Sequence, residues 1–263
     1  MKIACIGCGV MGSAFMSAIS KKVNPADITV SDKFIESAKS FATKTGCNVG
    51  TNCEAVKGSK YIFLAVKPAF VKEVLEDVKN CLEKDSIIIS MAAGISLDFW
   101  ESNIPSQRFI RIMPNMPAQI SEGMTALCYK CDISESELSE VISLIEATGK
   151  VEVVDEKLMD CVTAVSGSGP AYAFMFIEAM ADAAVKLGMP RKQAYTYAAQ
   201  TLKGAATMAL QDERNPAALK DAVCSPGGTT IEAVAALEKY GFRNAVIEAV
   251  TAAHDKSVAM GKK

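Results

Sequence analysis

The chain has 263 residues, half of them hydrophobic, so it can bury a substantial core as one large domain or two ordinary ones. Its 28 basic and 30 acidic residues give a formal net charge of −2 without long runs of one sign. Apolar runs such as residues 61–66 are far shorter than the roughly 20 residues that span a bilayer. We therefore expect neither a nucleic-acid partner nor a membrane, and a small-molecule partner is favoured.

The first part of the chain alternates short β-branched runs with amphipathic stretches. Alternation of this kind is typical of right-handed βαβ units, in which helices cover both faces of a parallel sheet. Strands are expected at residues 2–6, 28–31, 61–66, 86–90, 108–112, 124–129 and 151–154, and helices at residues 13–21, 35–43, 69–82 and 135–148. The pattern predicts a Rossmann-like α/β domain, with a doubly wound and mostly parallel sheet, over residues 1–155.

After Asp155 the strand pattern ends and alanine-rich sequence punctuated by glycine and proline follows. It predicts an all-α domain of about five helices over residues 156–263. In the helix expected at residues 171–187, charges recur every four residues in one thin stripe, and the other faces are apolar. One chain cannot readily cover such a helix, so we predict that the domain packs against its copy in a homodimer; a self-contained bundle is the alternative.

The nine cysteines are an odd number and fall mostly in expected strands and helices, as at Cys5 and Cys81. This favours buried, reduced thiols and a cytoplasmic location. Cys5–Cys8 and Cys128–Cys131 share the C-x-x-C spacing of zinc ligands. Cys8 lies in a glycine-rich turn with another evident use, so no metal site is predicted.

That turn is G-C-G-V-M-G, in which Gly7, Gly9 and Gly12 fit the pattern G-x-G-x-x-G. Glycine there permits a tight turn, close approach of backbone to a pyrophosphate, and close packing of helix on strand, while the helix N-terminus attracts the phosphate charge. Because the pattern stands after a strand and before a helix, it predicts that residues 1–155 bind a dinucleotide.

Asp32 follows the second expected strand, where dinucleotide sites read the adenosine ribose. Its carboxylate can accept hydrogen bonds from both ribose hydroxyls, which favours NADH, whereas Lys33 can pair with the 2′-phosphate of NADPH. The sequence leaves both cofactors open. Ligands of open α/β sheets bind at the carboxyl ends of the strands, so turns after three other strands are expected to share this edge: Ala65–Pro68, Ala92–Gly94 and Met113–Asn115.

In the helical half, the stretch V-C-S-P-G-G-T-T immediately precedes an expected helix. Gly227 and Gly228 can adopt positive φ and lack a Cβ, so consecutive N–H groups can converge on an anion at the positive end of that helix. The hydroxyls of Ser225, Thr229 and Thr230 can add hydrogen bonds; a simple N-cap at either threonine is the alternative. We predict a carboxylate cradle in which Thr230 hydrogen-bonds a reacting nitrogen.

The motifs GCGVMG, AVKP, MPN, SGSGPAY and SPGGTT occur in this order and cover essentially the full chain. Together they resemble the pyrroline-5-carboxylate reductase family, and the last two are the most specific. The resemblance implies reduction of 1-pyrroline-5-carboxylate to L-proline with NADPH or NADH, as the last step of proline biosynthesis. It also implies a nucleotide-binding domain, a helical dimerisation domain, and dimers that can assemble into decamers.

The resemblance places binding residues at matching positions. The expected cofactor contacts are Gly7, Gly9, Val10, Met11, Gly12, Asn52, Ala65, Val66, Lys67, Pro68, Ala92, Ala93 and Gly94. The expected substrate contacts, contributed by the partner subunit, are Ser225, Gly227, Gly228, Thr229 and Thr230, with Glu213 near the substrate amine. Asp32 departs from the pattern, because many members have an uncharged or phosphate-binding residue there.

Two other functions are weighed against this one. A related imine or β-hydroxyacid reductase shares the two-domain plan, but the hydroxyacid enzymes require a lysine in the central helix, and Lys186 lies at its far end. A non-catalytic dinucleotide sensor has no need of the carboxylate cradle, so it predicts that Thr230→Ala leaves behaviour nearly unchanged.

Overall fold

The computed structural model describes residues 1–105, 107–130 and 132–261. It divides into two compact units. The first comprises Met1–Ser168 and the end of the chain from Ala253 onward, and the second comprises Gly169–Ala252.

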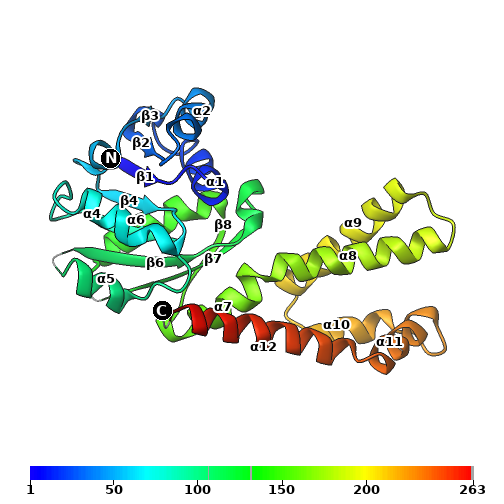
Figure 1. The fold of residues 1–263 in the computed structure, drawn as a ribbon. Helices are drawn as coiled ribbons and strands as arrows, with labels where there is room; N and C mark the ends of the chain where they lie inside the picture. The colour runs from blue at the N-terminus through cyan, green and yellow to red at the C-terminus, as the bar shows by residue number, and fades with distance from the viewer. Residues whose placement is uncertain (106, 131, 262–263) are drawn as a thin grey trace. The chain divides into compact units, whose positions relative to one another are not determined.

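The first unit is built on an eight-stranded sheet with the order β3-β2-β1-β4-β5-β6-β7-β8 (Figure 1). The strands are β1 (Ile3–Ile6), β2 (Ile28–Ser31), β3 (Asn48–Val49), β4 (Tyr61–Leu64), β5 (Ile87–Ser90), β6 (Arg108–Met113), β7 (Gly123–Tyr129) and β8 (Gly149–Val153). Neighbours pair in parallel except β6 with β7, which are antiparallel. The order of the first six strands is that of a doubly wound dinucleotide-binding sheet, which confirms the predicted fold.

Two hydrophobic clusters cover the two faces of this sheet. Side chains alternate along β1, so that Ile3 and Cys5 join one cluster while Ala4 and Ile6 join the other. The first cluster takes apolar side chains from helices α1 (Val10–Ile19), α2 (Ile35–Thr45) and α6 (Glu135–Ile145). The second takes them from α3 (Asn52–Val56), α4 (Val71–Val78), α5 (Leu97–Asn103) and α7 (Met159–Val162). The central strands are buried on both sides, as in other parallel sheets.

The second unit is helical throughout its described length and has a small core. Its helices are α8 (Gly169–Lys186), α9 (Arg191–Gln211), α10 (Pro216–Val223), α11 (Thr229–Lys239) and the greater part of α12 (Phe242–Gly261). The buried members of its apolar cluster are three alanines, Ala181, Ala194 and Ala198. Large apolar side chains of α8 stay exposed, Phe174 by 55% and Met175 by 69%. So little buried apolar surface gives one copy of this unit little stabilisation of its own.

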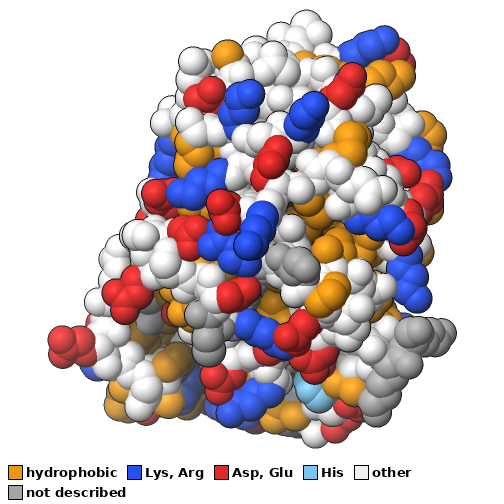
Figure 2. Space-filling model, turned by 90° about the vertical axis from the view of Figure 1, so that its left-hand side faces the viewer, with side chains coloured by type: hydrophobic (Ala, Val, Ile, Leu, Met, Phe, Trp, Pro, Cys, Tyr) orange, Lys and Arg blue, Asp and Glu red, His pale blue; other side chains and the backbone are white. Residues whose placement is uncertain are grey.

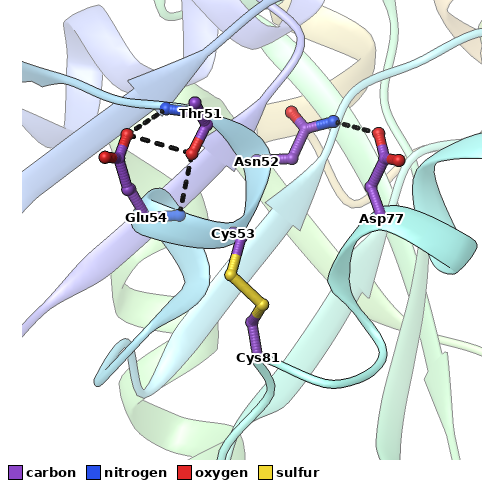
Figure 3. The surroundings of a disulfide bond; sticks show 6 residues. All are labelled: Thr51, Asn52, Cys53, Glu54, Asp77 and Cys81. Atoms are coloured by element: carbon purple, nitrogen blue, oxygen red, sulfur yellow. Dashed lines mark hydrogen bonds between the residues drawn. A yellow bond between two sulfur atoms is a disulfide. The ribbon is translucent and has the colours of Figure 1, made fainter.

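One cysteine prediction is wrong. Cys81 was expected to be a reduced thiol, but it forms a disulfide with Cys53 (Figure 3). Helix α3 and the turn after α4 bring the two Cα atoms to 5.5 Å, a separation that a disulfide spans. The residues lie 28 positions apart, and pairing at that distance cannot be deduced from spacing alone. Cys5 is a buried free thiol, as expected.

The surface of the described part carries both signs of charge. On the face drawn in Figure 2, Lys and Arg side chains are interspersed with Asp and Glu side chains. None of the helices among the described residues is both long enough and apolar enough to cross a lipid bilayer.

Candidate active site

The glycine-rich turn lies directly against the end of β4. Gly7 has φ +102°, and a Cβ on it would approach the carbonyl oxygen of Ala65 to 2.5 Å. A Cβ on Gly12 would lie 1.9 Å from the Gly7 oxygen and 3.0 Å from the Ala65 Cβ. Both positions therefore require glycine for close packing of α1 on the strands. The same contacts bring two predicted cofactor segments together, G-C-G-V-M-G and Ala65–Pro68.

Gly9 has a different surrounding. It is the N-cap of α1, and an ideal Cβ there meets no other described atom within 4 Å. Within the described chain no side chain caps this helix, and its first turn contains no acidic residue. The N–H groups at the start of α1, at Val10 and Met11, are thus available to an anion, and the helix dipole favours negative charge there. An open glycine before an uncapped helix fits the pyrophosphate of a dinucleotide.

At the end of β2, Asp32 connects the glycine-rich turn to the next predicted contact. Its carboxylate accepts hydrogen bonds from the backbone N–H of Cys8 at 2.7 Å and of Phe34 at 2.8 Å. Each oxygen keeps a second lone pair, which a ribose hydroxyl can use. Asn52 stands nearby, because its Oδ1 accepts a hydrogen bond from Ser31 at 2.8 Å. Asp32 and Asn52 line one hollow of about 400 Å³, so this part of the predicted site comes together.

The predicted contact at Ala92–Gly94 follows β5. Ala92 is buried, and its backbone N–H donates to the Ser90 hydroxyl at 3.2 Å. Gly94 has φ +75°, and a Cβ on it would lie 3.4 Å from the backbone nitrogen of Gly261. The end of α12 therefore packs on this turn, and Ser257 of α12 donates to Asp160 at 2.6 Å. The turn is therefore held at its start by the Ala92–Ser90 hydrogen bond and at its end by the contact of Gly94 with α12.

The turn after β6 is tied to the segment that precedes α8. Asn115 accepts a hydrogen bond from the Met124 N–H at 2.9 Å and donates to the Ser166 hydroxyl at 3.2 Å. Ser166 lies in a π-helical segment, Thr163–Gly167, and a Cβ on Gly167 would lie 2.7 Å from the Met113 side chain. Wide π-helical turns of this kind are frequent at functional sites. Ser166 is thus engaged as a structural hydroxyl.

In the second unit, the loop before α11 has the form of an anion cradle. Gly227 has φ +67°, a conformation that favours glycine. Gly228 has φ −81° and needs glycine for another reason, since a Cβ there would lie 2.3 Å from the Ser225 hydroxyl. Gly228 is the N-cap of α11, and in the described chain no side chain caps that helix. The expected alternative of a threonine N-cap is therefore not seen, because Thr229 and Thr230 form the first turn instead.

Glu213 is not next to that loop within one chain. It is an exposed residue between α9 and α10, whereas the glycine loop follows the far end of α10. Eight helical residues span about 12 Å, so α10 keeps the two sites apart. A role for Glu213 beside the substrate is therefore not explained by its place relative to the loop in one chain.

Cys8 and Cys128 each belong to one of the C-x-x-C pairs, and their thiols are partly or fully buried. Burial and the charge of Asp32 raise the pKa of Cys8 to about 12, and burial raises that of Cys128 to about 12. Cys131, the other member of the second pair, lies outside the described residues.

Family models match both halves of the chain. Residues 156–260 match the model described as pyrroline-5-carboxylate reductase dimerisation. Residues 2–94 match a model described as NADP oxidoreductase, coenzyme F420-dependent. The chain is 44% identical over 265 residues to the pyrroline-5-carboxylate reductase of Escherichia coli (strain K12), covering 99% of this chain and 98% of the relative. The chain belongs to the pyrroline-5-carboxylate reductase family.

Solved structures of pyrroline-5-carboxylate reductases have the same fold. The Coxiella burnetii protein superposes with a TM-score of 0.92 at 32% identity, over 100% of this chain and 99% of that one. The Plasmodium falciparum protein, solved with NADP bound, gives 0.90 at 31% identity, over 99% and 98%. The resemblance inferred from the motifs is confirmed, as is the class of enzyme, an NAD(P)H-dependent oxidoreductase of the pyrroline-5-carboxylate reductase family that forms homo-oligomers.

One residue beside the predicted cofactor site was missed from the sequence. Asp77, near the end of α4, accepts a hydrogen bond from the Asn52 side-chain amide at 3.1 Å and lines the same hollow (Figure 3). It lies on the polar face of an amphipathic helix, where a carboxylate is ordinary. No sequence motif includes Asp77. Its place beside the cofactor site becomes evident only from the packing of α4 against α3, which brings it to Asn52.

Proposed function

We propose that this chain catalyses the NAD(P)H-dependent reduction of 1-pyrroline-5-carboxylate to L-proline, the last step of proline biosynthesis. The observation that carries the proposal is the pairing in one chain of two uncapped helix N-termini, each after a glycine turn. One suits the pyrophosphate of a dinucleotide and the other the carboxylate of a small acid. Family membership over the full chain supports the same reaction.

The bound nicotinamide supplies a hydride to the carbon of the cyclic C=N bond. The protein's contribution is positioning, because hydride transfer needs the two carbons held about 3 to 3.5 Å apart. We assign the cofactor to the turns at the edge of the sheet: Gly7, Gly9, Val10, Met11, Gly12, Asp32, Asn52, Ala65, Val66, Lys67, Pro68, Ala92, Ala93 and Gly94.

The substrate is assigned to the loop before α11. The backbone N–H groups at the start of α11 and the hydroxyls of Ser225 and Thr229 hold its carboxylate, and Thr230 hydrogen-bonds the imine nitrogen. A hydroxyl is too weak an acid to protonate that nitrogen unaided. Thr230 therefore captures the imine already protonated or relays a proton from water.

We propose that the active site is completed by a second subunit. We place the boundary between the two domains between residues 155 and 156. The helical domain pairs with its copy in an intertwined homodimer. These dimers can assemble further into a decamer. The exposed Phe174 and Met175 and the core of three alanines support this pairing, because a partner can cover them. Glu213 then reaches the substrate amine across subunits. We place the enzyme in the cytoplasm, where its reduced cofactor is available.

The test follows the loss of nicotinamide absorbance when the purified chain is given 1-pyrroline-5-carboxylate with NADPH or NADH, and identifies the product. The proposal expects L-proline in equal amount to the cofactor oxidised. A chain that binds the cofactor but oxidises none of it with this substrate would be a sensor or a reductase of another compound.

A further inference from the structure

The hollow at the adenosine end of the cofactor site has acidic walls. It is lined by the end of β2, the start of α3 and α4. Asp32 contributes a carboxylate from the first of these and Asp77 from the last. Glu54 does not line the hollow, and its carboxylate accepts a hydrogen bond from the Thr51 N–H at 2.7 Å (Figure 3). Hydrogen bonds from the Thr51 backbone lower the pKa of Glu54, which therefore stays charged.

The start of α3 carries an internal cap. Thr51 and Glu54 form a complete capping box, in which the Thr51 hydroxyl also accepts a hydrogen bond from the Glu54 N–H at 3.2 Å. Two backbone N–H groups at this helix start, those of Thr51 and Glu54, are thus already engaged. The Asn52 side chain is engaged as well, between Ser31 and Asp77.

Of the described residues that line the hollow, one is a cation, Lys33. Its ammonium lies 3.1 Å from the Glu73 carboxylate and 5.1 Å from the centre of the Phe70 ring. Both contacts hold it toward the start of α4. The ion pair with Glu73 offsets its charge, so Asp32 and Asp77 have no compensating cation among the lining residues that are described.

One hydrogen bond restrains the exposed side chain of Asp77. The Asn52 amide donates to its carboxylate, and the Cys53–Cys81 disulfide joins the helix that carries Asn52 to the turn after α4 (Figure 3). Asp77 therefore cannot swing away from an incoming phosphate without breaking that hydrogen bond.

We propose that Asp32 and Asp77 make this enzyme select NADH over NADPH. The inference rests on the cofactor site proposed above and concerns the preference that this chain's own residues set. A ribose 2′-hydroxyl can donate to the free lone pairs of Asp32, whereas a 2′-phosphate brings a charge of about −1.5 to −2 and donates nothing when ionised. Asp32 is half-buried and Asp77 is exposed, and near a protein surface like charges a few ångströms apart repel each other by an amount that salt can screen. The Plasmodium relative was solved with NADP bound, which shows that that protein accepts this cofactor. Selectivity in the present chain is a separate quantity, the difference between its affinities for NADH and NADPH.

The experiment uses cofactor fragments that carry no nicotinamide, so it does not depend on turnover. Binding of ADP-ribose and of 2′-phospho-ADP-ribose to the full-length protein is measured by calorimetry at low and high salt. We expect ADP-ribose to bind at least tenfold more tightly than 2′-phospho-ADP-ribose. The ratio of the two Kd values should shrink as salt screens the carboxylates. Asp77→Asn keeps an oxygen for the Asn52 hydrogen bond and should narrow the ratio; Asp32→Asn should narrow it further. Glu76→Gln, an equal charge change elsewhere on α4, should leave the ratio unchanged.

Equal binding of the two fragments by the wild-type protein, or tighter binding of the phosphorylated one, overturns the selectivity while leaving the reaction intact. The same holds if Glu76→Gln narrows the ratio as much as Asp77→Asn, because net charge would then explain it. If neither fragment binds, both the selectivity and the placement of the adenosine end are wrong. Proline formation tests the reaction separately.

Discussion

Replacing Gly9 by alanine tests whether this glycine is needed for cofactor binding and not for folding. Gly9 has φ −70° and ψ −169°, which alanine adopts readily, and its added Cβ meets no described atom within 4 Å. The free energy of unfolding should therefore change by no more than about 1 kcal/mol, because alanine restricts the unfolded chain but is a poorer N-cap than glycine.

The cost of Gly9→Ala should appear in cofactor binding. The methyl group occupies the space in front of the free N–H groups of α1, where a pyrophosphate must approach closely. Losing two hydrogen bonds to a charged group, at about 1.5 to 3 kcal/mol each, removes at least about 3 kcal/mol. That corresponds to a Kd raised by roughly a hundredfold or more.

The assay is calorimetric titration with NADH and NADPH beside a denaturant unfolding curve. Gly12→Ala is the matched comparison, because its Cβ would lie 1.9 Å from the Gly7 oxygen and must destabilise the fold as well. A Gly9→Ala protein that binds either cofactor with wild-type affinity would refute the assignment of the pyrophosphate to this turn.

Three further predictions follow from single side chains. Thr230→Ala should lower kcat markedly while the cofactor Kd changes little, as measured by steady-state kinetics and titration; equal kcat would support a sensor. Cys81→Ser removes a disulfide between residues 28 positions apart and should lower the free energy of unfolding by up to about 3 to 4 kcal/mol. Dithiothreitol should cause no further loss in this variant, and an unchanged denaturation midpoint would contradict the prediction. Hydrogen bonds from Ser134 and Arg108 lower the pKa of Glu137, so its stabilisation is present above the ordinary carboxyl range and is lost as pH falls from about 5 through the lowered value. Glu137→Gln should flatten that part of the stability profile, and an unaltered profile would assign the acid sensitivity elsewhere.

Elements with strong periodicity were predictable from the sequence. The apolar runs that become β1, β4 and β5 are buried on both faces, and their shortness and flanking turn residues identify them as strands. Strand β3, with two residues, and helix α3, with five, were missed, because elements so short carry no period. Helix α1 begins at Val10, three residues before the expected start, since the glycine turn ends sooner than glycine content suggests.

The cofactor turn was predictable because its physical requirements fall on consecutive residues. Gly7 and Gly12 meet steric demands of the fold, whereas Gly9 leaves open space before the helix, and the spacing of the three glycines reflects both requirements. The acidic hollow was not predictable, because Asp77 reaches it from a helix 45 residues after Asp32 and through a hydrogen bond to Asn52. The disulfide beneath it escaped for the same reason, since tertiary packing alone brings its cysteines together.

The central claim is that the glycine loop of one subunit works with the cofactor turn of the other. It is tested by mixing Gly9→Ala subunits, defective in cofactor binding, with Thr230→Ala subunits, defective in the substrate loop. If each site draws on both subunits, a mixed dimer contains one site with both halves intact, and random mixing should restore about a quarter of wild-type activity. If each site lies within one subunit, every site keeps one defect, and activity no higher than that of the separate variants would contradict the claim.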